Sequence, residues 1–372
     1  MTRLSRRSYP VAIKHLLRHG IALWLLSLQP GSALADWYTD QAAIMGTAIN
    51  VELWHDNEQQ GRALTRAVME EMHRIDELMS TYKPDSELSY INAHAATGPV
   101  TVSSELLSLI IRALDYSVVT AGAFDITYAS AGQYYDYRIG KKPSETQLQG
   151  ALPAINYRHV KIDPQRSTVE FMRPGVRIDL GGIAKGYAVD RSIDLLEQAG
   201  VHNAIVSAGG DTRVIGKRWD RSWKIGIRNP RQQDSIVSMV PLENSAISTS
   251  GDYERYFDED GVRYHHILNP GTGKSTHEVQ SSSIIGADAT DTDALSTSVF
   301  VLGVQQGIQL INALPGTEAI IIDNMGRMHY SEGLTRLEKR PFAPARRSCT
   351  TGYTAVADCD PRLQPVTRTA EE

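Results

Sequence analysis

Three segments of this 372-residue sequence combine side chains and spacings that could carry out chemistry. In residues 179–186 an acid, Asp179, precedes two adjacent glycines, and Lys185 and Gly186 follow. Glycines at the start of a helix let backbone N–H groups approach an anion, and the helix dipole favours a phosphate there. The segment therefore predicts a phosphate-binding turn, and a close-packed turn between a strand and a helix is the alternative.

Common nucleotide-binding and hydrolase motifs do not fit the sequence. Lys185 is followed by Gly186, whereas the lysine of a Walker A loop is followed by serine or threonine. The Rossmann pattern G-x-G-x-x-G is absent, as are the G-x-S-x-G elbow of serine hydrolases and the H-E-x-x-H helix of zinc proteases. A phosphate site in this chain would therefore be of another kind.

A second segment, residues 287–297, places three acids just before or at the start of a predicted helix. Acids in that position are often helix caps, and Asp291 is the residue that we expect in this role. Asp293 and Thr297 are four residues apart, so their side chains share one helix face. A carboxylate and a hydroxyl that converge in this way suit Mg²⁺, which takes few protein ligands and completes its shell with water and phosphate oxygens.

The third segment, residues 264–273, contains two adjacent histidines in a predicted strand that enters a turn. Neighbouring strand residues point to opposite faces, so His265 and His266 are not expected to share one metal site. One of them could act in a site while the other is exposed or fills space, and a structural role is the alternative for either. Residues 122–127 and 248–251 are interpreted as turns with polar caps.

The overall composition is that of a folded globular protein rather than a disordered or fibrous chain. Hydrophobic residues make up 41% of the sequence and charged residues 22%. The formal net charge of −5 argues against a dedicated nucleic-acid binder, which usually carries a basic patch. Two cysteines are too few for a disulfide scaffold or for a four-thiolate zinc or iron–sulfur site.

The N-terminus has the organisation of a secretory signal peptide. A basic stretch without acids precedes a short apolar run at 21–28 and a small-residue site at 33–35. The run is shorter than the roughly 20 residues of a membrane-spanning helix, which disfavours a membrane anchor. We expect residues 1–35 to be cleaved after Ala35 and the protein to be periplasmic. Residues 5–9 partly resemble a twin-arginine signal, so the export route is either Sec or twin-arginine.

Predicted helices and strands follow one another from residue 40 to residue 340 without an evident linker. This order indicates a single domain of the α+β or α/β class. The elements predicted around the chemical residues are a strand at 176–180, a helix at 187–199, a strand at 204–211 and a helix at about 291–302.

Two further segments are expected to lie outside the core. Residues 130–150 are polar and tyrosine-rich and are predicted to form an exposed excursion. Residues 341–372 are predicted to be a flexible tail, in which Cys349 and Cys359 could form a local disulfide in an oxidising compartment.

Eight short motifs, taken in order, resemble the ApbE family of FAD:protein FMN transferases. They are M-G-T (45–47), S-T-Y-K-P-D-S (80–86), G-A-F-D-I-T (122–127), D-L-G-G-I-A-K-G (179–186), G-G-D (209–211), S-T-S-G (248–251), H-I-L-N-P-G-T-G (266–273) and D-A-L-S-T (293–297). The resemblance implies an α+β fold of the T-fold-like ApbE type over residues 36–340. This would be a single catalytic unit with mixed sheets and flanking helices.

The resemblance also implies an activity outside the cytoplasm. Members of the family bind FAD and Mg²⁺ and transfer the FMN half of FAD to a threonine or serine hydroxyl of a partner protein, releasing AMP. The expected partner is a flavin-accepting subunit of a membrane redox complex or a periplasmic flavoprotein, without nucleic acid and without stable membrane insertion after signal cleavage. Some members mainly hydrolyse FAD to FMN and AMP.

The site residues that the resemblance implies fall largely on the segments already singled out. Asp293 and Thr297 would hold the metal with a backbone carbonyl at or near Gly182. The residues expected to line the FAD site are Met45, Tyr82, Ala123, Phe124, Asp125, Asp179, Lys185 and Ile267. His266 is the expected general base, with Asp179 or another acid as the alternative, and Lys185 would add positive potential. After the A-F-D segment, residues 128–150 lack the proline- and tryptophan-containing continuation of many members.

Two other functions remain open from the sequence. A metal-dependent FAD pyrophosphatase would use the same site with water as the acceptor. A non-catalytic periplasmic flavin carrier would need no Mg²⁺ ligands, so the presence of Asp293 and Thr297 counts against it.

Overall fold

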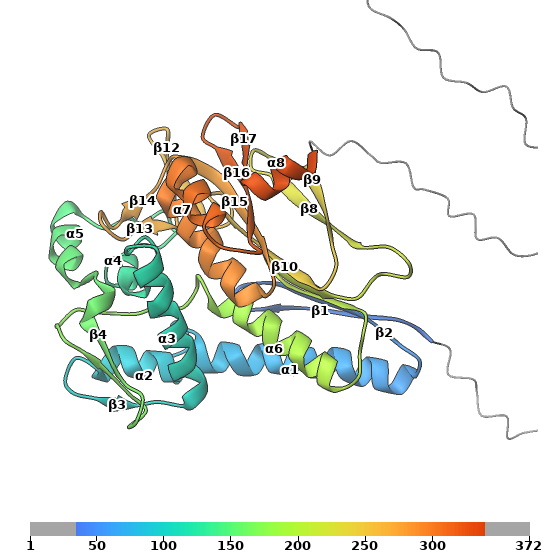
Figure 1. Cartoon of the computed structure of the whole chain (residues 1–372). Helices are drawn as coiled ribbons and strands as arrows, with labels where there is room; N and C mark the ends of the chain where they lie inside the picture. The colour runs from blue at the N-terminus through green and yellow to red at the C-terminus, as the bar shows by residue number, and fades with distance from the viewer. Residues whose placement is uncertain (1–34, 339–372) are drawn as a thin grey trace, which may run out of the picture.

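A computed structural model describes residues 35–338 of the chain (Figure 1). The predicted signal peptide, apart from Ala35, and the predicted tail with both cysteines lie outside the described residues. The first element of the described part, strand β1, begins at Asp36.

An eight-stranded antiparallel sheet forms the centre of the fold, in the order β1-β2-β6-β7-β10-β15-β16-β17. Its strands are β1 (Asp36–Ile44), β2 (Thr47–His55), β6 (Ala204–Ala208), β7 (Asp211–Ile215), β10 (Ser245–Gly251), β15 (Val279–Gly286), β16 (Glu318–Asp323) and β17 (Met328–Tyr330). The antiparallel sheet with separate helices confirms the α+β class and excludes a doubly wound α/β fold.

Three long helices pack against the sheet and against one another (Figure 1). They are α1 (Glu58–Met79), α6 (Ala184–Gln198) and α7 (Ala289–Asn312). Helix α7 is long and apolar enough to span a membrane by length and composition, but half of that stretch is buried inside the protein. Because α7 contacts β10, β15 and α6, it is a core helix of this fold.

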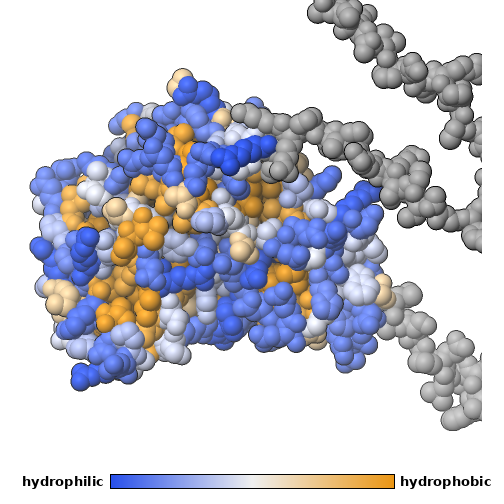
Figure 2. All heavy atoms as spheres, in the orientation of Figure 1, coloured by the Kyte–Doolittle hydropathy of each residue, from blue (hydrophilic) through white to orange (hydrophobic). Residues whose placement is uncertain are grey.

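A second group of elements lies beside the central layers. It contains α2 (Glu87–His94), α3 (Ser104–Val119) and a three-stranded sheet of β3 (Val100–Thr101), β5 (Thr168–Phe171) and β4 (Val160–Asp163). In the face shown in Figure 2, apolar surface gathers over α3, whose last two residues, Val118 and Val119, are exposed.

Three two-stranded hairpins complete the strands of the described part. Their members are β8 (Trp223–Asn229) with β9 (Gln232–Leu242), β11 (Tyr256–Glu259) with β12 (Val262–His265), and β13 (Leu268–Asn269) with β14 (Lys274–Ser275). The short helices are α4 (Ala129–Gly132), α5 (Glu145–Ala151) and α8 (Glu332–Glu338), with 3₁₀ turns at Ile126–Tyr128, Leu152–Ala154 and Tyr157–His159.

Two sequence predictions near the site are wrong. Residues 176–180 belong to no strand, because Ile178 exchanges its backbone hydrogen bonds with the Asn92 side chain, at 2.8 Å each, instead of with a neighbouring strand. The helix expected from residue 187 already begins at Ala184, so Gly186 lies in its first turn.

The stretch 130–150 is also not simply an exposed excursion. It contains α4 and α5, which bury Ala131, Leu148 and Ala151 in a small apolar cluster. Composition alone does not predict this cluster, because the residues between the two helices are polar.

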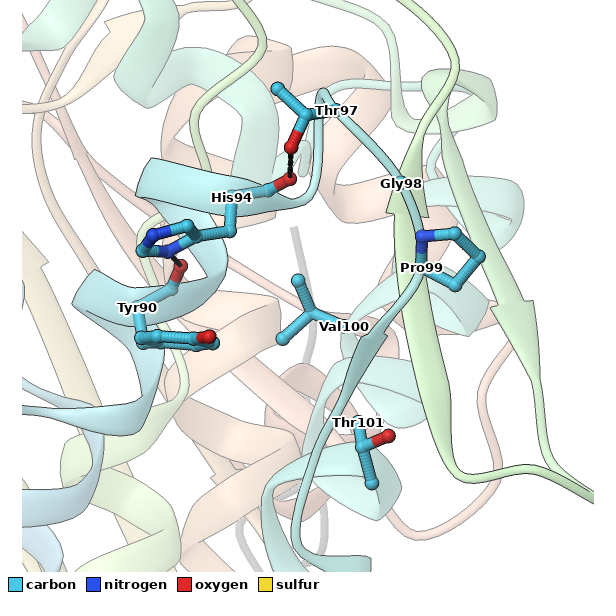
Figure 3. A pocket seen from close by; sticks show the side chains of 7 residues that line it. All are labelled: Tyr90, His94, Thr97, Gly98, Pro99, Val100 and Thr101. Atoms are coloured by element: carbon cyan, nitrogen blue, oxygen red, sulfur yellow. Dashed lines mark hydrogen bonds between the residues drawn. The ribbon is translucent and has the colours of Figure 1, made fainter.

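A shallow hollow on the second group of elements is unrelated to the predicted chemistry. It measures about 390 Å³ and lies between the end of α2 and β3, where Tyr90 stacks on His94 with 4.1 Å between ring centroids (Figure 3). The His94 ring and the Thr97 hydroxyl both form hydrogen bonds with backbone carbonyls of α2, so local contacts account for both side chains (Figure 3).

Candidate functional site

A close crossing of α6 and α7 brings two of the predicted segments together. A Cβ on Gly186 would lie 2.0 Å from the backbone oxygen of Ala289 and 2.8 Å from Cβ of Asp293. No side chain fits in that space, so the glycine allows the first turn of α6 to meet the start of α7. The glycine turn and the acidic segment therefore form one site.

Asp293 lies at the centre of this crossing and is 2% exposed. Its Oδ2 accepts the backbone N–H of Gly186 at 3.0 Å, and the Nζ of Lys185 lies 3.3 Å from both carboxylate oxygens. Burial, and then the negative charge of Asp211, raise the pKa of Asp293, while Lys185 opposes the rise.

Lys185 is shared between two carboxylates. Its Nζ donates to Oδ2 of Asp211 at 2.6 Å in addition to its contact with Asp293. Burial by itself would lower the pKa of Lys185, but the charges of Asp211 and Asp293 raise it on balance. The site thus holds two acids and one lysine, which remains an ammonium.

Thr297 lies one turn after Asp293, beside the glycine pair. A Cβ on Gly182 would lie 3.2 Å from Oγ1 of Thr297 and 3.1 Å from the ring of Phe124, which is itself buried. The Thr297 hydroxyl also lies 3.2 Å from Oγ of Ser250 on β10. The three predicted metal-ligating positions, Gly182, Asp293 and Thr297, therefore meet at one place.

The segment 248–251, interpreted from the sequence as a turn, belongs to strand β10 and fixes α7 on the sheet. The hydroxyls of Ser248 and Thr292 lie 2.8 Å apart, as do those of Ser250 and Ser296. These two hydroxyl pairs hold the helix face that carries Asp293 and Thr297 toward the sheet.

The N-terminal cap of α7 differs from the prediction. Asp288, not Asp291, is the capping residue, and it accepts the N–H of Asp291 at 2.9 Å. Asp291 instead pairs with Arg112 of α3, at 2.5 Å. The sequence could not distinguish the two acids because both precede the apolar residues of the helix.

Asp190 of α6, which the sequence did not single out, holds the start of α7. Its carboxylate accepts the backbone N–H groups of Ala289 and Thr290 at 2.9 and 2.8 Å, the Thr290 hydroxyl at 2.5 Å, and Nη1 of Arg213 at 2.9 Å. This buried acid ties α6, α7 and β7 together behind the site.

Asp190→Ala is therefore expected to lower the free energy of unfolding by about 3 kcal/mol, because it leaves two helix N–H groups without their acceptor and removes the nearest anion from the Arg213 guanidinium. Urea unfolding followed by circular dichroism measures the change. A loss below about 0.5 kcal/mol, as at a surface position, would contradict the assigned role.

Asp179 holds the glycine turn in shape. Its carboxylate accepts hydrogen bonds from the hydroxyl of Thr81 at 2.7 Å, the hydroxyl of Tyr128 at 3.0 Å and the N–H of Gly181 at 2.7 Å. Three donors on one carboxylate link the S-T-Y motif to the glycine turn.

Asp125 is likewise held by its own surroundings. It accepts the N–H and hydroxyl of Thr127 at 2.8 and 2.6 Å and the N–H of Tyr157 at 2.8 Å. Burial raises its pKa, and these hydrogen bonds oppose the rise. Asp125 thus holds the turn that directly follows Ala123 and Phe124, and the Phe124 ring lies beside Gly182.

The remaining predicted FAD-site residues differ in exposure. The Tyr82 ring is 80% exposed, so it is available for stacking on a ligand. Met45 forms the tight turn between β1 and β2 with a positive φ of 55°, and an Arg255 nitrogen lies 3.1 Å from the place of a Cβ on the following Gly46. Ile267 is buried in an apolar cluster with Leu295.

The two histidines have different environments, as predicted, although neither is exposed. Nε2 of His265 contacts the Thr276 carbonyl oxygen at 2.6 Å, its Nδ1 accepts the N–H of Ile267 at 3.3 Å, and its ring packs edge-on against Phe300. His265 is therefore structural.

His266 has a buried ring nitrogen, Nδ1, with no hydrogen-bond partner among the residues that the structure describes. Burial, followed by the positive charges of Arg255, His265 and Lys185, lowers the pKa of His266 to about 3. Its imidazole is therefore neutral near pH 7.

Stability should depend on pH through His266. The unfolded chain takes up a proton near pH 6.5, whereas the folded chain does so only near pH 3, so the unfolded state binds more protons between these values. Stability is then fully present above pH 6.5 and is lost as the pH falls toward 3. We expect His266→Asn to lose less unfolding free energy than the unmodified protein between pH 7 and pH 5 in urea titrations. Equal losses would show that His266 is not held neutral.

The sequence between residues 45 and 321 matches the family model described as the ApbE family. The chain belongs to the ApbE family.

Curated ApbE relatives cover most of the chain. A protein named FAD:protein FMN transferase from Treponema pallidum is 32% identical over 82% of this chain and 89% of its own length. A Klebsiella pneumoniae protein of the same name is 31% identical over 77% of this chain and 89% of its own length.

Solved ApbE structures share the fold. The ApbE protein of Thermotoga maritima has a TM-score of 0.75 and 36% identity, covering 82% of this chain and all of that one. The flavin transferase ApbE of Vibrio cholerae has a TM-score of 0.73 and 27% identity, covering 81% and 99%. The fold expected from the ApbE resemblance is thereby confirmed.

The donors at the centre of this ApbE site suit a hard divalent cation. The Lys185 ammonium already lies beside Asp293, and Gly182 lies close to the Thr297 hydroxyl. Among residues 35–338 no cluster of three or more His, Cys, Asp or Glu side chains could hold a metal. A metal here would rely on few protein ligands, as Mg²⁺ commonly does.

Proposed function

We propose that this protein is an Mg²⁺-dependent FAD:protein FMN transferase, which moves the FMN half of FAD onto a threonine or serine hydroxyl of an acceptor protein and releases AMP. The observation that carries the proposal is the buried Asp293, held beside Lys185 and the N-terminus of α6 and one turn before Thr297. Membership of the ApbE family and the names of its curated relatives support it.

In the proposed reaction the acceptor oxygen forms a bond to the FMN-side phosphorus of FAD. The bond from that phosphorus to the bridging oxygen breaks, and AMP leaves with the bridging oxygen. Positioning and charge stabilisation supply most of the catalysis in phosphoryl transfer. Lys185 would face the diphosphate with its ammonium, while the positive N-terminal end of the α6 dipole would add to the potential there.

Mg²⁺ would be held by Asp293, Thr297 and a backbone carbonyl at or near Gly182. Bound there, it would neutralise charge on the diphosphate and on the AMP leaving group. Met45, Tyr82, Ala123, Phe124, Asp125, Asp179 and Ile267 would shape the FAD site around these charges, several of them through the turns described above.

His266 would accept the proton of the acceptor hydroxyl. Its neutral imidazole is in the correct protonation state for a general base, and its pKa would rise when the negative diphosphate offsets the charges of Arg255 and Lys185. Asp179 is the alternative base, but its three hydrogen bonds favour a role in holding the glycine turn.

The competing function is FAD hydrolysis, in which water replaces the acceptor hydroxyl. Incubating the protein with FAD and Mg²⁺, with and without an acceptor protein, distinguishes the two. A transferase releases AMP in step with acceptor modification and forms little free FMN, whereas a hydrolase releases FMN and AMP equally fast without acceptor.

We further propose that the protein acts in the periplasm on a flavin-accepting subunit of a membrane redox complex or on a periplasmic flavoprotein. The signal-peptide pattern of residues 1–35 supports export. Fractionation of cells that produce the full chain, with N-terminal sequencing of the mature protein, tests this: a mature terminus at Asp36 is expected, and an uncleaved cytoplasmic chain would contradict it.

A further inference from the structure

Asp211 differs from the other buried acids around the site. Asp190 and Asp179 each accept several hydrogen bonds from the protein, whereas Lys185 is the only side-chain hydrogen-bond partner of Asp211 within residues 35–338. Asp211 is also buried, with 1% of its surface exposed. A buried carboxylate with one partner indicates a role directed at that partner.

The backbone holds Asp211 rigidly. It is the first residue of β7, paired with Ala208 of β6 on one side and Ser248 of β10 on the other. The two glycines before it make the close turn possible: a Cβ on Gly209, at φ +63°, would lie 2.5 Å from the Thr47 hydroxyl, and one on Gly210 would lie 2.4 Å from the Thr249 carbonyl oxygen.

The Lys185 ammonium is thereby held in a fixed place, and its distances to the two acids are unequal. It is 2.6 Å from Asp211 but 3.3 Å from each oxygen of Asp293. The shorter contact is to the acid that is not expected to bind metal.

We propose that Asp211 is a positioning residue, which anchors the Lys185 ammonium so that Asp293 can exchange its contact with Lys185 for one with a divalent cation while the ammonium stays beside it. This inference rests on the metal site of the proposed function. Without Asp211, Lys185 has Asp293 as its only anion and competes with the metal for it.

The test uses the whole mature protein without FAD and measures Mn²⁺ and Mg²⁺ binding by calorimetry. Asp211→Asn keeps the shape and removes the charge, and it should weaken metal binding by about tenfold, equivalent to 1.4 kcal/mol. Asp211→Glu retains an anion for Lys185, so it should keep most of the metal affinity of the unmodified protein. Asp252→Asn is the matched control, because Asp252 is a buried acid paired with Arg231 and does not contact Lys185.

A double-mutant cycle with Lys185→Met separates anchoring from a direct effect on the metal. Lys185→Met alone should strengthen metal binding several-fold, because it removes the competing ammonium. In that background, Asp211→Asn should have a smaller effect than in the unmodified protein. An equal or larger effect would mean that Asp211 acts on the metal directly and would overturn the inference.

Thermal melting in EDTA checks that each variant folds. If Asp211→Asn does not fold, the metal affinity of Lys185→Met is the deciding measurement. An affinity equal to or weaker than that of the unmodified protein overturns the inference. If the unmodified protein binds neither metal, the proposed metal site fails and the inference fails with it. If the unmodified protein binds the metal and Asp211→Asn binds it with the same affinity, the inference is overturned while the proposed metal site stands.

Discussion

Asp293→Ala is expected to reduce FMN transfer by at least about a thousandfold while the protein still folds, because a metal and its charge stabilisation contribute several kcal/mol to such a reaction and each 1.36 kcal/mol is tenfold in rate. The variant removes the only carboxylate among the expected metal-ligating residues. It also removes the acceptor of the Gly186 N–H and one of the two anions around Lys185. The measurement is the initial rate of AMP release with FAD, Mg²⁺ and acceptor.

The matched control is Asp291→Ala, which lies on the same helix turn but pairs with Arg112 away from the site. It should retain transfer within a few-fold. A thermal melt and circular dichroism show whether Asp293→Ala is folded. Normal transfer by folded Asp293→Ala at saturating Mg²⁺ would refute the assignment of the metal site.

Replacing His266 by asparagine is expected to lower kcat by about 10²- to 10⁴-fold, the usual contribution of a general base, with little change in the KM for FAD. The reason is that its neutral ring has a buried nitrogen without a partner in the described part of the chain, beside the cations that would meet the diphosphate. Single-turnover kinetics with preformed FAD complex separates the chemical step from binding.

His265→Asn gives the contrasting result. Both nitrogens of His265 are engaged by the backbone, so this variant should lose stability more than it loses catalytic rate per folded molecule. If the two histidine variants showed the same pattern, with stability and kcat lowered together, the division of roles between them would be wrong.

The sequence predicted those parts of the site that depend on local spacing. Asp293 and Thr297 share a helix face because they are one turn apart, and this holds in α7. The glycine turn before a helix was evident from 179–186, although the helix begins earlier than predicted. Glycine suggested a break, whereas Gly186 is inside the helix because only a residue without Cβ fits against Ala289.

The parts that the sequence could not predict depend on contacts between distant segments. Asp190 and Asp211 look like ordinary polar residues in the sequence, and only the crossing of α6 and α7 and the pairing of β7 with β10 give them their partners. The G-G-D motif marks Asp211 in the sequence, but the role of Asp211 depends on its contact with Lys185, which the sequence does not show. Residues 176–180 have the apolar alternation of a strand, and this alternation is the same whether the partner is a strand or the Asn92 side chain.

The most direct test of the proposed function is the intact mass of an acceptor protein after incubation with this protein, FAD and Mg²⁺. We expect the acceptor to gain the mass of one FMN less one water, on a threonine or serine, with one AMP released for each FMN attached and no reaction in EDTA. An acceptor of unchanged mass, while FAD is converted to free FMN and AMP at the same rate as without it, would show that the protein is a hydrolase and contradict the proposed transfer.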